Sequence, residues 1–118
     1  MIDKIEIVRF IEREFNIKPD YPWEKFPNYA AFRHKRNRKW FGLLMNIKED
    51  KLNIDGDNAI DVLNLKVIQE FIGPLRKKKG IYPAYHMDKN HWISINLNEF
   101  ESLEEIEGLI IDSYELTY

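Results

Sequence analysis

The feature that most constrains the fold is a set of β-prone runs joined in pairs by short turn-forming segments. The first pair covers residues 29–35 and 38–47 with Arg36-Asn37 between them, and the second covers residues 81–87 and 91–97 with Asp88-Lys89-Asn90 between them. Asparagine tolerates the left-handed backbone that a tight turn needs, and strands connected this closely pair antiparallel. The sequence therefore predicts two β-hairpins, which join a third strand at residues 60–66 in a mostly antiparallel sheet.

Helices are predicted at both ends of the chain and once between the strands. The pattern from Asp3 to Glu6 matches a capping box in front of an apolar stripe, which predicts a helix over residues 3–15. The pattern from Ser102 to Glu105 matches a second capping box, and the stripe that follows it predicts a C-terminal helix. Residues 67–79 are expected to form a short helix that is interrupted at its Gly-Pro pair.

These elements follow in the order α-β-β-β-α-β-β-α. Hairpins and a meander favour antiparallel pairing, and helices grouped at the chain ends are able to cover one face of the sheet. The predicted fold class is therefore α+β, a two-layer sandwich of a five-stranded sheet with helices on one face. The other face is expected to be open to solvent.

Side-chain alternation predicts which residues lie on the open face. In the run 91–97, Ile93 and Ile95 are expected to face the helices, which leaves Trp92 on the open side. The same rule divides the run 38–47 into two sets, which are Trp40, Gly42, Leu44 and Asn46 on one side and Phe41, Leu43, Met45 and Ile47 on the other. Two tryptophans are therefore expected to share an exposed surface.

Length and composition indicate a single domain of a cytoplasmic protein. The 118 residues show no linker and no repeat, so residues 1–118 are expected to form one domain. The absence of cysteine excludes disulfides and Cys-bound metal centres, and it suits a reducing compartment such as the cytoplasm. No segment approaches the ~18 uncharged apolar residues of a membrane span, and no signal-peptide core is visible.

The net charge of −2 is distributed unevenly. A cluster without any acid is formed by Arg33, Lys35, Arg36, Arg38 and Lys39. At a hairpin tip this cluster is expected to project as a basic finger toward phosphates, with Tyr29 or Trp40 available for stacking, although a solvated loop that keeps an edge soluble is the alternative. The C-terminal helix carries acids and no lysine or arginine, so a polyanion is expected to dock elsewhere.

Signatures of catalysis and of metal binding are sparse. The chain has no Gly-x-Gly-x-x-Gly, no phosphate-binding Gly-Lys-Ser/Thr loop and no Gly-x-Ser-x-Gly elbow. We therefore expect a non-enzymatic protein with no catalytic residues, no metal and no cofactor. His86 and His91 flank a turn near Asp88. A Zn²⁺ or Fe²⁺ site at this turn is therefore a weaker alternative, because a third strong ligand is missing.

Several phrases resemble the MmcQ/YjbR family of small bacterial proteins. The most specific is His86-Met87-Asp88-Lys89-Asn90-His91-Trp92. The others are Tyr21-Pro22-Trp23, Phe32-Arg33-His34, Lys39-Trp40-Phe41, Asn64-Leu65-Lys66, Tyr82-Pro83-Ala84-Tyr85 and Ser113-Tyr114, so the resemblance spans nearly the whole chain. It implies a CyaY-like fold and DNA binding by a double wing, for which the hairpin at 33–39 and the turn at 87–91 are the candidates.

The predicted function is weak DNA binding through the basic hairpin and the open sheet face. The expected nucleic-acid-binding residues are Arg33, Lys35, Arg36, Arg38, Lys39, Trp40, Lys66, Tyr85, His86, Lys89, His91 and Trp92. The phrase at 86–92 is equally compatible with a structural role, in which cross-strand aromatic and polar pairs hold the hairpin register. The alternative function is a protein-interaction module that receives a peptide or partner domain on the open face or at an edge strand.

Overall fold

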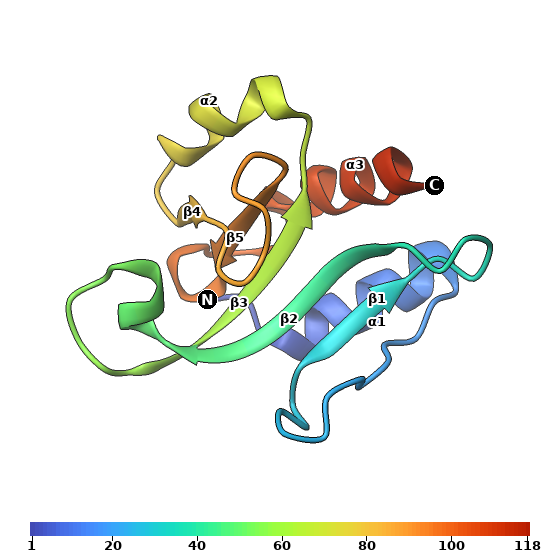
Figure 1. The fold of residues 1–118 in the computed structure, drawn as a ribbon, viewed down its shortest axis with the longest axis horizontal. Coiled ribbons are helices and arrows are strands. Elements are labelled where there is room, and N and C mark those ends of the chain that lie inside the picture. Colours follow the sequence, from blue (N-terminus) through green and yellow to red (C-terminus); the bar gives the residue numbers. More distant parts are fainter.

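One five-stranded sheet organises the molecule, and three α-helices pack around it (Figure 1). The structure is a computed structural model that describes residues 1–118. The strands are β1 (Ala30–Arg33), β2 (Trp40–Lys48), β3 (Ala59–Lys66), β4 (Ile81–Pro83) and β5 (Trp92–Asn96). The helices are α1 (Lys4–Phe15), α2 (Ile72–Arg76) and α3 (Glu107–Thr117), with short 3₁₀ turns η1 (Glu49–Leu52), η2 (Gln69–Phe71), η3 (Leu97–Glu99) and η4 (Leu103–Glu105). The predicted fold class and element order are confirmed.

All neighbouring strands pair antiparallel in the order β1-β2-β3-β5-β4. Both predicted hairpins are present, but the second is looser than expected, because residues 84–91 form a long connection between β4 and β5. In the first hairpin the left-handed residue is Arg38, with φ of 62°, and not Asn37. No helix in the structure combines the length and the apolar character that crossing a bilayer requires.

Helices α1 and α3 cover one face of the sheet and build the larger core (Figure 1). Asp3 caps α1 as predicted, because its carboxylate accepts from the Ile5 N–H at 2.9 Å while Glu6 accepts from the Asp3 N–H at 2.9 Å. The buried core side chains on this side are Ile7, Phe10 and Ile11 of α1, Ile110 of α3 and Ile106 just before α3, and they pack on strand residues that include Phe32, Leu63, Leu65, Ile93 and Ile95. The face predicted for Ile93 and Ile95 is thus confirmed.

The opposite face of the sheet is not open, which corrects the sequence-based expectation. A second buried cluster lies there and consists of Ala31, Leu43, Met45, Ile47, Leu52, Ile60 and Val62. Connecting segments cover it and contribute Trp23, Tyr29, Ile54, Tyr85 and Met87, and Tyr82 of β4 packs against it as well. Loops therefore replace a helical layer on this side, and only part of the face remains accessible.

A β-bulge at Phe41 changes the predicted alternation on β2. Phe32 pairs with Gly42 while Arg33 pairs with Trp40, so Phe41 is the extra residue of its strand. Phe41 turns to the helical side, where its ring lies edge-on to Tyr114, and Trp40 joins the cluster on the opposite side. Trp40 therefore shares a face with Leu43 rather than with Leu44.

Two helix boundaries also differ from the prediction. The Ser102 side chain caps nothing, because residues 103–105 form the separate turn η4 and α3 begins only after Ile106. Glu105 accepts instead from the N–H of Glu101 at 3.1 Å. The Gly-Pro pair of α2 does not interrupt that helix, since proline is tolerated in a first turn where its missing N–H has no partner.

Candidate nucleic-acid interface

The turn between β1 and β2 is fastened to the end of α3 and is not a free finger, contrary to the sequence-based expectation. His34 is 2% exposed, and its Nε2 lies 2.7 Å from the Thr117 hydroxyl. The Asn37 side-chain amide donates to the carbonyl oxygens of Thr117 and Tyr118 at 2.9 and 3.1 Å. Arg36 lies over the Tyr118 ring, 4.7 Å from its centroid. These contacts fix the position of the basic cluster relative to the helical layer.

Burial sets the ionisation of His34. It lowers the pKa of the imidazole, and the nearby charges of Arg36 and Lys39 lower it further, against a backbone hydrogen bond at Tyr114 that raises it. The Thr117 hydroxyl donates to the Ser113 carbonyl at 2.8 Å, so its oxygen accepts from His34 Nε2. His34 is therefore a neutral structural residue, and the charge of the turn comes from its lysines and arginines.

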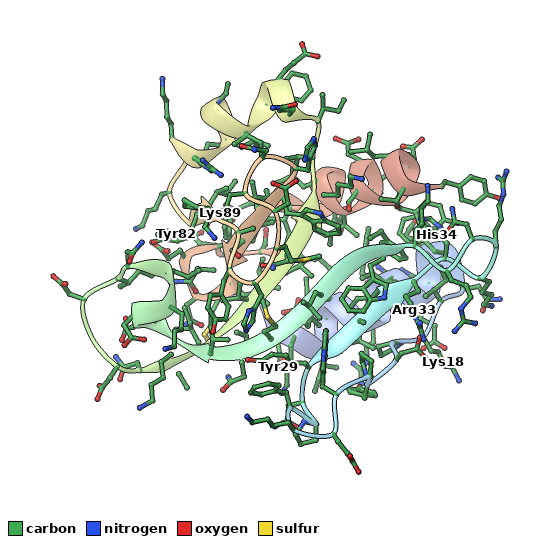
Figure 2. The ribbon with its side chains drawn as sticks, viewed as in Figure 1. Lys18, Tyr29, Arg33, His34, Tyr82 and Lys89 are labelled. Carbon is green, nitrogen blue, oxygen red and sulfur yellow. The ribbon has the colours of Figure 1, made fainter.

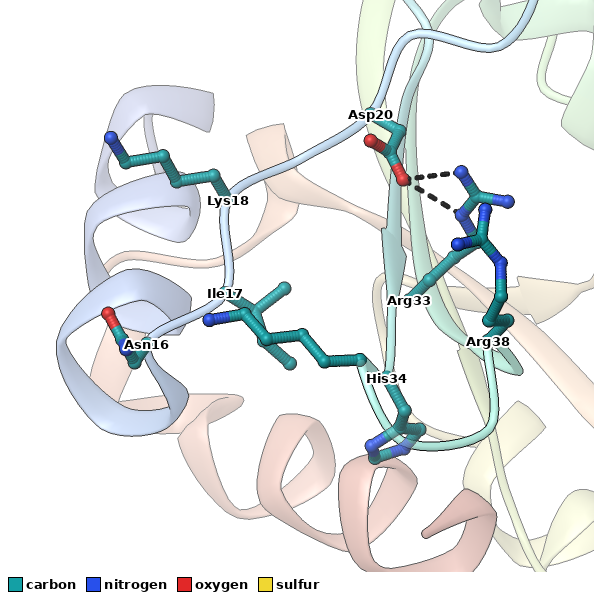
Figure 3. Close-up of a pocket in the computed structure, with 8 residues that line it drawn as sticks. Asn16, Ile17, Lys18, Asp20, Arg33, His34 and Arg38 are labelled. Carbon is teal, nitrogen blue, oxygen red and sulfur yellow. Dashed lines mark hydrogen bonds and ion pairs between the residues drawn. The ribbon is translucent and has the colours of Figure 1, made fainter.

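A cationic pocket lies between this turn and the segment that follows α1 (Figure 3). Its volume is about 340 Å³, and only one of its eight lining residues is hydrophobic. They are Asn16, Ile17, Lys18, Asp20, Arg33, His34, Lys35 and Arg38. Four of these side chains are cations from two separate stretches of chain, and one is a carboxylate. The pocket is therefore suited to an anion.

Backbone pairing positions the two walls of the cationic pocket. Asn16 ends α1 in the left-handed conformation, and Asp20 and Ala31 exchange two backbone hydrogen bonds of 2.8 Å, which hold the segment along β1. The Asp20 carboxylate accepts from Arg33 Nε at 2.8 Å and lies 2.7 Å from Arg33 Nη2, as the dashed lines of Figure 3 mark. Arg33 is thus held in place and partly neutralised, whereas Lys18, Lys35 and Arg38 are exposed.

An aromatic pocket occurs on the loop-covered face of the sheet. Its volume is about 290 Å³, and it is lined by Trp23, Phe26, Tyr29, Trp40, Leu43, Met45, His86 and Met87. Trp40 and Arg33 are cross-strand partners, so the two pockets adjoin at the β1–β2 hairpin. The structure therefore brings together Trp40 and His86, two of the predicted site residues, which are distant in sequence.

The remaining predicted residues are divided between the sheet and its covering loop. Lys66 and Trp92 are cross-strand partners at the ends of β3 and β5. Tyr85 is part of the loop cover, because its N–H donates to Ser94 Oγ at 2.9 Å and its carbonyl accepts from Asn64 at 2.8 Å.

The turn at 88–91 is held by its own contacts. His91 Nδ1 lies 2.6 Å from Asp88, and this imidazole, together with the Asn90 N–H, holds the pKa of the Asp88 carboxyl below its ordinary value. The carbonyl of Lys89 accepts from Arg76. Lys89 lies on the β4 side of the molecule and Arg33 on the β1 side (Figure 2), whereas Met87, at the start of the second candidate wing, lines the aromatic pocket together with Trp40. No group of three or more His, Asp or Glu side chains is arranged to hold a metal ion.

Sequence reasoning missed Lys18 and Asp20 of the cationic pocket and Phe26 of the aromatic pocket. Trp23 was noted only within the phrase Tyr21-Pro22-Trp23. The segment that contains these residues is rich in proline and has no periodicity, so its path along β1 is fixed by long-range backbone pairing. The sequence signal that could have indicated this pocket is the aromatic content of the loop, which is higher than expected for a solvent-exposed connection.

The fold and its two adjoining pockets define a small α+β protein with an antiparallel sheet covered by helices on one side and by loops on the other. The chain belongs to the YjbR family, whose model matches residues 16–116. It is 47% identical over 117 residues to the uncharacterized protein YyaQ of Bacillus subtilis, with 99% of each chain covered.

Solved structures agree with this assignment. A crystal structure of a protein from Pseudomonas syringae is 50% identical, with a TM-score of 0.96 over 99% of this chain and 100% of that one. The Deinococcus radiodurans protein DR2400 is 22% identical, with a TM-score of 0.69 over 95% of this chain and 76% of that one, and this likeness concerns the fold alone. The resemblance that the sequence motifs suggested is confirmed.

Proposed function

We propose that this protein binds DNA through the phosphate backbone at the cationic pocket. The observation that carries the proposal is the convergence of Lys18, Arg33, Lys35 and Arg38 from two chain segments on one pocket with a single, already paired carboxylate. Lysine and arginine contacts to phosphates position a protein on DNA without reading its sequence. The proposed role is binding and not catalysis, because the charged groups of the pocket are suited to holding an anion.

We expect the affinity for DNA to be modest, and we expect DNA to contact only one side of the protein. The net charge is −2, and α3 carries only acidic charges, so much of the surface repels a polyanion. The cationic pocket is also too small to cover more than a few phosphates. A chain without cysteine suits a reducing compartment, and we propose that the binding takes place in the cytoplasm.

The salt dependence of binding tests the proposal. If about four phosphates are neutralised, the logarithm of the association constant falls with the logarithm of salt concentration at a slope near −4. Fluorescence anisotropy of a labelled duplex over a range of salt measures this slope. The pair Lys35→Glu and Arg38→Glu is expected to abolish binding.

A matched control uses the same charge change elsewhere on the surface. Lys77 and Lys78 are exposed after α2, away from the hairpin turn (Figure 1). Lys77→Glu with Lys78→Glu is expected to weaken binding much less than the pocket pair. Equal losses from the two pairs, or a flat salt response, would show that the cationic pocket is not the binding site.

A second candidate function is that of a protein-interaction module. The surface that favours it is neither the sheet face nor an edge strand, which were the surfaces expected from the sequence. The sheet face is covered, β1 is flanked by Asp20, and the short edge strand β4 contains Pro83, so strand addition has little support. An apolar groove of about 470 Å³ instead lies between η2–α2 and α3, with Phe71 and Leu116 exposed and with Asp112 and Glu115 among its lining residues. This groove suits an amphipathic segment with basic flanks.

The groove hypothesis has its own test. A labelled helical peptide of leucine and lysine is expected to bind the protein, and Phe71→Ser is expected to weaken that binding about tenfold. Ile5→Ser on α1 changes an equally exposed apolar residue and should have no effect. Loss of peptide binding in both variants would point to non-specific adsorption.

A further inference from the structure

The aromatic pocket is a pre-formed cavity with walls of defined orientation. Trp23 lies edge-to-face against Tyr29, at 5.9 Å and 81°, and against Trp40, at 5.3 Å and 85°. Phe26 stacks on Tyr29 at 4.7 Å and 13°. Seven of the eight lining residues are hydrophobic, and the lining residues come from the loop between α1 and β1, from β2 and from the covering loop. The contacts among the rings hold the cavity open without a ligand.

The size and lining of the aromatic pocket restrict its ligand. A volume of about 290 Å³ is at the lower end of the usual range for ligand sites, so the cavity takes a single ring system. No carboxylate is among its lining residues, which disfavours a cationic guest. The polar groups among the lining residues include the indole N–H groups of the two tryptophans, the His86 ring and the Tyr29 hydroxyl, and burial raises the pKa of that phenol, so it remains a neutral donor. A flat, neutral heteroaromatic ring meets these conditions.

The neighbouring charge indicates what this ring is attached to. Arg33 of the cationic pocket and Trp40 of the aromatic pocket are cross-strand partners. The segment along β1 also contributes to both, with Lys18 and Asp20 in one and Trp23 and Phe26 in the other. A ligand that spans the two pockets has an anionic group beside a planar ring, which is the chemistry of a nucleotide.

We propose that the aromatic pocket accepts one unstacked base of a DNA strand whose phosphates lie on the cationic pocket. The inference rests on the proposed function and deepens it by naming the form of DNA. A base in a duplex presents only its edges, whereas a pocket walled by aromatic rings encloses a base only after it has left the stack. Single-stranded DNA is therefore the preferred ligand over duplex of the same length.

The experiment compares three probes with the unmodified protein at low salt. They are an oligothymidylate of about eight nucleotides, a duplex of the same length, and an abasic deoxyribose-phosphate strand that keeps the phosphates and lacks the bases. We expect the oligothymidylate to bind at least tenfold more tightly than either of the other two and to quench tryptophan emission. Equal affinity for the thymidylate and abasic strands overturns the base pocket and leaves phosphate binding intact. Failure of all three to bind overturns the proposed function itself.

Two substitutions localise the effect. Trp23→Leu keeps an apolar side chain in the loop and removes one wall, so it is expected to weaken thymidylate binding about tenfold and to leave duplex binding unchanged. Phe71→Leu is the control, because Phe71 is an exposed aromatic residue outside both pockets, and it should change neither affinity. An equal or larger loss of the preference for single-stranded DNA from Phe71→Leu than from Trp23→Leu would overturn the assignment.

Discussion

At the scale of single residues, the buried pair of His34 and Thr117 connects the first hairpin to the last helix. Thr117 is 5% exposed, accepts from the imidazole at 2.7 Å and donates to Ser113 at 2.8 Å. Thr117→Val keeps the shape of the side chain and leaves a buried imidazole donor without a partner. We expect the free energy of unfolding to fall by about 1–3 kcal/mol, measured by urea denaturation. Ser102→Ala, at an exposed hydroxyl that caps nothing, should stay within about 0.5 kcal/mol.

The same imidazole predicts how stability depends on pH. The pKa of His34 in the folded protein lies below its ordinary value of 6.5, so the unfolded chain takes up the proton first. Stability is therefore full above about pH 7 and falls as the pH drops below about 6.5. Urea midpoints between about pH 7 and pH 5 measure this loss.

Two comparisons isolate His34 from the other titrating groups. His86→Asn replaces an exposed histidine and is expected to leave the dependence of stability on pH unchanged. His34→Asn is expected to remove most of that dependence. Asp88 contributes to stability over a different pH range. Its pKa is lowered, so its contribution to stability is lost only as the pH falls below about 4. A wild-type protein equally stable at pH 7 and pH 5 would contradict the role assigned to His34.

At the scale of elements, the capping box of α1 makes a local contribution that the sequence alone predicted. Asp3→Ala removes the acceptor of the Ile5 N–H and is expected to cost about 1 kcal/mol of stability. Thermal and urea unfolding measure the change. Asp55→Ala provides the control, since Asp55 is an exposed acid of a loop that precedes β3. A loss as large for Asp55→Ala would mean that net charge, and not capping, sets the effect.

Elements whose causes are local were predictable, and those set by packing were not. Asp3 and Glu6 form their box from atoms three residues apart, whereas the matching pattern at Ser102 fails because Ile106, with no exposed surface, enters the core and α3 starts after it. The bulge at Phe41 has no local signature, since Trp40 and Phe41 are both aromatic and only tertiary contacts decide which faces the helices. The basic side chains of the site were visible in sequence, but their partner Lys18 depended on the path of an irregular segment.

At the scale of the whole molecule, the cationic turn lies beside the end of the acidic helix, although the sequence led us to expect that a polyanion would dock away from that helix. Asn37 and His34 bind the end of α3, so Glu115 lies in the helical turn nearest the basic cluster. The molecule measures 39 × 34 × 26 Å, which is close to the Debye length of ~30 Å at ~0.01 M salt and far above the ~8 Å at ~0.15 M. Distant acids therefore oppose DNA binding only at low salt, while near ones oppose it at both.

This difference in range gives a prediction for the proposed DNA binding. Glu115→Gln, close to the hairpin turn, is expected to raise DNA affinity several-fold at low salt and still measurably at ~0.15 M. Asp57→Asn removes the same charge from the loop between η1 and β3, at the other end of the molecule from the turn (Figure 1), and is expected to act only at low salt. Anisotropy titrations of both variants at the two salt concentrations make the comparison. If the two variants behave identically, the DNA does not bind closer to Glu115 than to Asp57. If the effect of Asp57→Asn persists at ~0.15 M salt, the DNA-binding surface lies near the loop that contains Asp57.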